Sequence, residues 1–155
     1  MLGHLGFSYT GLIFLLMLFI PNIIWSKNQP IDYRFIKENK TLLWFERIGQ
    51  VTCSGCVLIF SDFNIVSFSV WSLWLAGTFL LMMLYEIAWV RYFINPHTEK
   101  NFYRSFCAIP LPLATLPIAA FLLLGIYGKV IWLIISAVIL GIGHLGIHIQ
   151  HQKSR

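Results

Sequence analysis

Residues 130–151 read VIWLIISAVILGIGHLGIHIQH, a long apolar run that contains no Lys, Arg, Asp or Glu. A helix needs about 20 predominantly apolar residues to cross the hydrocarbon core of a bilayer, and this run has the required length. Four further apolar runs lie upstream, at about 6–26, 48–66, 71–93 and 106–127. The sequence therefore predicts an all-α membrane protein with one domain, 1–155, built as a bundle of five transmembrane helices.

The overall composition supports the same class of protein. Hydrophobic residues make up 58% of the chain and charged residues only 11%. Soluble domains carry roughly 25% charged residues, so most of this surface is expected to face lipid. We therefore expect the lipid bilayer to be the main partner of the chain.

The basic residues predict the orientation in the membrane. Eleven residues are Lys or Arg, and all except Lys129 fall on one side of the predicted bundle. Because Lys and Arg gather in cytoplasmic loops, the N-terminus is predicted to lie outside and the C-terminus in the cytoplasm. The net charge of +5 is then a consequence of topology, and no nucleic-acid partner is expected.

Two carboxylates lie within the predicted spans. Glu86 is in the third span, where a charged side chain costs about 2.5–3.5 kcal/mol and is usually paired or functional. At about 1.5 Å of rise per residue, Glu86 and His144 each lie roughly 9 Å inside the inner boundary. The sequence thus predicts a ligand or ion site of Glu86, His144 and His148, with Asp62 at the outer mouth of a pathway. Alternatively, Glu86 is a structural pair, and Asp62 is an ordinary interfacial residue.

A second set of side chains has the chemistry of a metal site. His144, His148 and His151 are spaced i, i+4 and i+7 on one helical face, and Cys53 and Cys56 form a CxxC pair. Together they make a Cys2His2-type ligand set for a transition metal ion. The competing interpretations are that the cysteines are small packing residues and that His148 and His151 mark a helix end.

A resemblance to known proteins extends over nearly the whole chain. It rests on three stretches, GLIFLLMLFIPNIIWSKNQP, ENKTLLWFERIGQ and LLGIYGKVIWLIISAVILGIGHLGIHIQH. The sequence resembles a group of small, uncharacterised multi-pass membrane proteins of Gram-positive bacteria. This resemblance implies a location in the bacterial plasma membrane, and it implies no activity.

Three functions follow from these features. The first is binding or transport of a cation, proton or small solute through a site in the inner leaflet. The second is a non-catalytic accessory subunit, as a homo-oligomer or within a larger membrane complex. The third is a membrane-embedded metal or redox enzyme, and the sequence favours a non-enzymatic role over this one.

Overall fold

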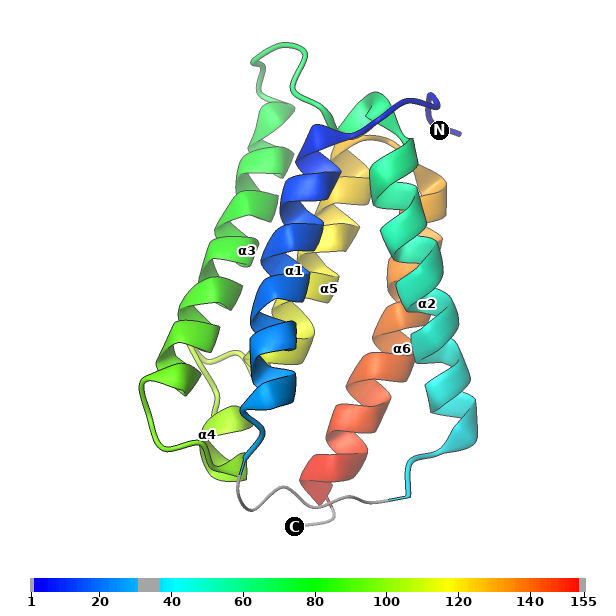
Figure 1. The fold of residues 1–155 in the computed structure, drawn as a ribbon. Helices are drawn as coiled ribbons and strands as arrows, with labels where there is room; N and C mark the ends of the chain where they lie inside the picture. The colour runs from blue at the N-terminus through cyan, green and yellow to red at the C-terminus, as the bar shows by residue number, and fades with distance from the viewer. Residues whose placement is uncertain (1, 31–36, 154–155) are drawn as a thin grey trace.

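The computed structural model describes residues 2–30 and 37–153, and within these ranges it is helical without strands. Five long helices run side by side, and the two chain ends lie at opposite ends of the bundle (Figure 1). The helices are α1 Tyr9–Lys27, α2 Lys40–Ile59, α3 Ser72–Phe93, α5 Pro112–Tyr127 and α6 Ile131–Lys153, with the short turns η1 Ser61–Phe63 and α4 Glu99–Phe102 between them.

Four of these helices, α1, α2, α3 and α6, are long and apolar enough to cross a membrane. The fifth, α5, has only 16 residues, most of them buried, and it packs against both α3 and α6. The all-helical prediction is therefore confirmed, and four of the helices are compatible with multi-pass insertion into a membrane. The exposed apolar residues of these spans face outward, as lipid-facing residues would, and include Leu80, Val138 and Ile142.

The start of α5 is set by two prolines. The predicted span begins at about 106, but the helix begins at Pro112. A residue that precedes proline is disfavoured in the α region, and proline fits best in the first helical turn. Pro110 and Pro112 therefore favour a helix start at 112, and before it the chain turns through Cys107, Ala108 and Leu111, all with positive φ.

The helix α2 begins earlier than the predicted span at 48. Asn39 caps it, because its side-chain oxygen accepts a hydrogen bond of 2.8 Å from the backbone N–H of Thr41. The first turns of α2 are consequently polar, with Lys40, Glu46 and Arg47. These charges made the segment resemble a loop in the sequence, whereas they form the polar end of a longer helix.

The N-terminal segment closes the other end of α2. The backbone N–H groups of Gly6 and Ser8 donate to the carbonyl oxygens of Ile59 and Leu58, at 2.9 and 3.0 Å. The last carbonyls of a helix have no partner within it, so this segment satisfies two of them. It also holds the start of α1 against the end of α2.

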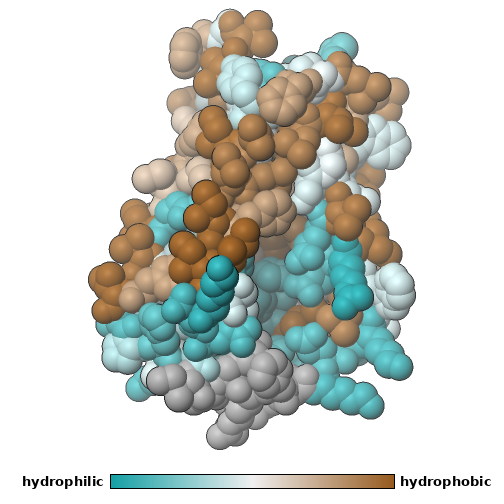
Figure 2. All heavy atoms as spheres, in the orientation of Figure 1, coloured by the Kyte–Doolittle hydropathy of each residue, from teal (hydrophilic) through white to brown (hydrophobic). Residues whose placement is uncertain are grey.

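The two ends of the bundle differ in charge. We call the end that holds Lys27, Lys40 and Lys153 the basic end; the opposite end holds residues 2–8, η1 and the turn at Lys129. Figure 2 shows the same division, with mainly hydrophobic residues over the middle and opposite end and hydrophilic residues toward the basic end.

Candidate functional site

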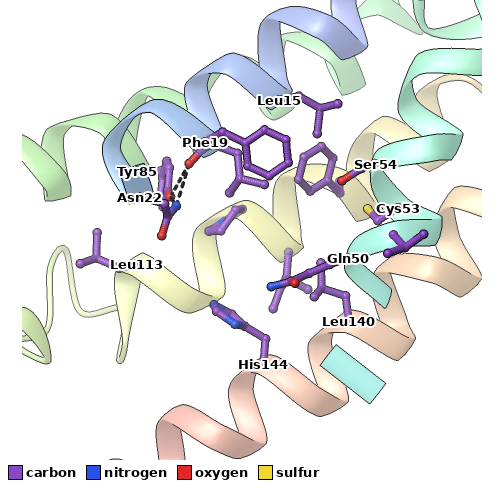
Figure 3. Close-up of a pocket in the computed structure, with 15 residues that line it drawn as sticks. Leu15, Phe19, Asn22, Gln50, Cys53, Ser54, Tyr85, Leu113, Leu140 and His144 are labelled. Atoms are coloured by element: carbon purple, nitrogen blue, oxygen red, sulfur yellow. Dashed lines mark hydrogen bonds between the residues drawn. The ribbon is translucent and has the colours of Figure 1, made fainter. Parts of the chain in front are cut away.

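A cavity of about 570 Å³ lies among the five long helices. We call it the cleft. Its lining is mostly apolar, with polar residues from four of the helices (Figure 3). The lining residues are Leu15, Leu18, Phe19 and Asn22 of α1; Gln50, Val51, Cys53 and Ser54 of α2; Tyr85 of α3; Leu113, Pro117, Ile118 and Phe121 of α5; and Leu140 and His144 of α6.

One polar wall of the cleft joins α1 to α3. The side-chain amide of Asn22 donates to the hydroxyl of Tyr85 at 2.7 Å, and the same amide donates to the carbonyl oxygen of Leu18 at 2.7 Å. Tyr85 is fully buried. These bonds use the donors of Asn22, so its carbonyl oxygen is the group left to accept a hydrogen bond from a ligand.

The facing wall comes from α2 and α6. Figure 3 shows Gln50 and His144 reaching into the cleft from these helices, with Asn22 and Tyr85 across from them and Ser54 farther along α2. Among the described residues, the side chains of Gln50 and Ser54 have no hydrogen-bond partner. An amide and a hydroxyl without protein partners are available to a molecule in the cleft.

His144 is fixed by a partner from α2. Its Nδ1 lies 2.5 Å from Oε1 of Glu46, and both side chains are largely buried. A carboxylate on one ring nitrogen orients the imidazole and leaves Nε2 for other contacts. Because His144 also lines the cleft, this pair ties the cleft wall to the packing of α2 on α6.

The other two histidines lie nearer the basic end. The ring of His148 is 4.5 Å from that of His144 and also contacts Phe102 and Tyr103. Nε2 of His151 lies 3.0 Å from Oε1 of Glu38. The predicted i, i+4, i+7 face therefore exists, but its first member is paired with Glu46 of α2 and its last member with Glu38, which lies just before α2.

The two cysteines of the CxxC pair have separate surroundings. Cys53 is buried and lines the cleft, while the sulfur of Cys56 is 4.0 Å from the hydroxyl of Ser136 on α6. Both are free thiols. Within the described ranges, no group of three or more His, Cys, Asp and Glu side chains is arranged to hold a metal ion.

Glu86 lies in another part of the bundle. It borders a smaller hollow of about 280 Å³ against α1, together with Ile13, Leu16, Met17, Ile20 and Pro21. Its Oε1 is buried and makes no hydrogen bond. The structure thus does not bring Glu86 and His144 to a common cavity, because Tyr85, the preceding residue, takes the position that faces the cleft.

Asp62 lies beyond the end of α2 and is bonded to the N-terminal segment. Its carboxylate accepts hydrogen bonds from the backbone N–H of His4, at 2.5 Å, and contacts His4 Nδ1 at 2.8 Å. Burial acts to raise the pKa of Asp62, but the hydrogen bonds from His4 and its charge outweigh burial and lower the pKa below the usual range. Asp62 therefore joins η1 to the N-terminal segment at the opposite end and does not line the cleft.

Sequence reasoning did not single out Asn22, Tyr85, Glu38 or Glu46. The sequence could have pointed to Asn22, since it is a polar residue that follows Pro21 inside an apolar run. Glu38 and Glu46 fell in the polar segment 27–47, which was predicted to be a loop and in part an interfacial helix. The pairing of Glu46 with His144 becomes visible only when α2 is extended to Lys40, and Glu38 lies just before the capping residue Asn39 of that helix.

The fold and the cleft define a small all-helical protein whose apolar segments are compatible with multi-pass insertion into a membrane. In comparisons with family models, curated proteins and solved structures, nothing matches this chain.

Proposed function

We propose that this chain is a five-span protein of a bacterial plasma membrane, with its N-terminus outside and its basic end in the cytoplasm. The charge asymmetry supports this orientation, because all Lys and Arg except Lys129 belong to the basic end or its predicted loops. At 16 residues, α5 is about 24 Å long. The turn before Pro112 and the flanking helices complete its crossing, since irregular backbone is tolerated where protein surrounds it.

We propose further that the protein binds a small organic solute in the cleft, which this orientation places in the inner half of the membrane. The observation that supports this proposal is the cleft itself. Its volume of about 570 Å³ lies within the range of about 300–1,000 Å³ that is usual for small-molecule sites, and apolar walls with a few convergent polar groups are typical of them.

The lining favours an organic solute over a cation. Its polar members are Asn22, Gln50, Ser54, Tyr85 and His144, and none of the lining residues within 2–30 and 37–153 is an Asp or Glu. A hard cation prefers several carboxylate or carbonyl oxygens as ligands. Glu46, the carboxylate that contacts a lining residue, is already bonded to His144.

The test is to recover what the purified protein holds. Protein extracted in mild detergent is denatured, and the released compounds are identified by untargeted mass spectrometry and quantified per protein. Leu18→Trp and Ser54→Trp place a large ring in the cleft from opposite walls, whereas Leu80→Trp places the same ring on the exposed face of α3.

We expect one compound in near-stoichiometric amount from the wild type and from Leu80→Trp, and a loss of at least about tenfold from the two cleft variants. A scaffold without a ligand would release no compound above the level of the surrounding lipid. Equal recovery from all four proteins would contradict the proposal.

A further inference from the structure

We infer that the ligand of the cleft is an uncharged, single-chain amphiphile that enters from the lipid phase through a side opening between α1 and α2. This inference rests on the proposed binding function and names the class of molecule bound. Its basis is the shape of the opening, the absence of net charge in the lining and the position of the polar groups.

The opening lies where α1 and α2 diverge toward the basic end after their close approach near the opposite end (Figure 1). There, Gly11 is so close to α2 that an added Cβ would collide with the carbonyl oxygen of Val57. Farther toward the basic end, Phe19 of α1 and Val51 of α2 both line the cleft, yet 45% and 74% of their surfaces are exposed. Two cleft-lining residues that remain this exposed form the edges of an opening toward the outside of the bundle.

The opening lies at the level where an amphiphile would rest. Figure 2 shows a hollow beside the hydrophobic surface, at the height where hydrophobic residues give way to hydrophilic ones toward the basic end. An amphiphile in a bilayer places its polar group near this boundary and its chain in the apolar core. It would therefore meet the opening in the orientation that the cleft requires.

The inner ends of the helices are held together beside the cleft. The side chain of Gln150 accepts from the backbone N–H of Asn39 at 3.1 Å and donates to the carbonyl oxygen of Lys37 at 3.0 Å, and His151 contacts Glu38. These contacts join α2 to α6 at the basic end. A side entrance from lipid is consequently favoured over an entrance between these two helices from the aqueous phase.

The lining favours a polar group without charge. Among the described lining residues, His144, Cys53 and Tyr85 are the ionisable ones, and the carboxylate of Glu46 is bonded to His144. A charged group would be desolvated there without a counter-ion, which is costly. Gln50 and Ser54 offer both donors and acceptors, so hydroxyl or ester groups suit the cleft better.

The experiment uses photoactivatable probes in nanodiscs that contain the full chain. One probe is a monoacylglycerol that carries a diazirine in its acyl chain, and the other is the matching free fatty acid, which differs in having a carboxylate. After irradiation, labelled protein is quantified, and the labelled peptides are mapped by mass spectrometry.

The matched variants are Val51→Trp at the edge of the opening and Val138→Trp on the exposed face of α6. Both add the same ring at an exposed valine, and the thermal unfolding midpoint of each is compared with that of the wild type. If Val51→Trp is not folded, Phe19→Trp on the facing edge of the opening takes its place.

We expect the monoacylglycerol probe to label peptides of α1 and α2 in the wild type and in Val138→Trp. Labelling should fall about tenfold in Val51→Trp, and the fatty-acid probe should label the wild type about tenfold less than the monoacylglycerol does, each equivalent to about 1.4 kcal/mol. Uniform labelling of all exposed helices, unchanged by Val51→Trp, would overturn the inference, as would equal labelling by the two probes.

The two proposals fail in different ways. A water-soluble compound that is recovered from the wild type, lost in Ser54→Trp and retained in Val51→Trp would refute the lipid-derived ligand while leaving the binding function intact. No bound compound and no localised labelling would refute both.

Discussion

The helix α2 has two neighbours and packs against them in opposite ways. Toward α6 it is in close contact over most of its length: a Cβ added to Gly49 would collide with the backbone of Leu140, and one added to Gly143 would collide with the backbone of Glu46. Toward α1, the glycine that marks a corresponding close approach is Gly11, near the opposite end. The cleft occupies the space that α1 and α2 leave between them.

The difference shows that the size of the residues between two helices determines where a cavity forms in a membrane bundle. Lipid supplies no hydrophobic force that drives two apolar helices together, so close contact depends on small residues at the interface. Glycines continue along the α2–α6 interface, whereas α1 presents Leu15, Leu18 and Phe19 beyond Gly11. These larger side chains keep the two helices apart and line the resulting space.

The largest effect is expected from a substitution that forces α2 and α6 apart. Gly143→Leu introduces a side chain where the backbone of Glu46 leaves no room. We expect a loss of about 3 kcal/mol in the free energy of unfolding, at the upper end of overpacking effects. Thermal unfolding in detergent can be followed with a thiol-reactive dye that reports the exposure of buried Cys53, in a Cys107→Ser background because Cys107 is exposed.

The control for this change is Gly55→Ala, since nothing lies within 4 Å of the added Cβ. Replacing a helical glycine by alanine should raise the free energy of unfolding by up to about 1 kcal/mol. If Gly143→Leu unfolded at the same temperature as this control, the α2–α6 interface would not be the close contact described above.

A second change acts on the one close contact between α1 and α2. Gly11→Ala should cost about 2 kcal/mol, because the added methyl group meets the carbonyl oxygen of Val57 and cannot be accommodated by a side-chain rotation. The same dye assay measures it. Gly77→Ala is the matched control, because its nearest neighbour, Leu123, is at an ordinary contact distance of 3.5 Å. Similar midpoints for the two variants would contradict the close approach at Gly11.

A smaller effect is expected from the polar contact across the α2–α6 interface. Glu46→Gln weakens the bond to Nδ1 of His144, and we expect a cost of about 1 kcal/mol because the pair is partly exposed. Glu86→Gln should cost less, since Oε1 of Glu86 has no partner to lose. A double-mutant cycle with His144→Ala isolates the Glu46–His144 coupling, and a coupling energy of zero would show that the contact contributes nothing.

The smallest expected effect concerns the opposite end of the bundle and depends on pH. Because the folded pKa of Asp62 is lowered, its contribution to stability is present above the pKa of the unfolded state. This contribution should fall as the pH drops below about 4, toward the folded pKa. Asp62→Asn should flatten the decline of the unfolding midpoint in this acid range, and an unchanged decline would assign it to other carboxylates.

The sequence predicted the helices better than their contacts. The apolar run at 71–93 corresponds closely to α3, because length and composition alone identify a candidate span. The polar start of α2 and the two prolines before α5 were harder to place, since a hydropathy pattern does not distinguish a polar helix end from a loop or a proline-containing helix from a turn.

The site was predictable in the same partial way. Cys53 and His144 were singled out for their chemistry, and both line the cleft. Glu86 was singled out as well, because its depth in the predicted span matches that of His144. Depth along a helix does not indicate how the helix is rotated about its axis. That rotation turns Tyr85 toward the cleft and Glu86 toward the smaller hollow against α1.

The pairing of Glu46 with His144 also has a consequence for biosynthesis. The two residues are 98 positions apart, so α2 leaves the ribosome long before α6 exists. During that interval Glu46 lacks its histidine, and Gly49 of α2 lacks the helix that packs against it. The bundle therefore cannot assemble strictly in the order of synthesis: α2 reaches its final environment only when the last helix arrives, and a nascent chain that stops before α6 would leave Glu46 without its histidine.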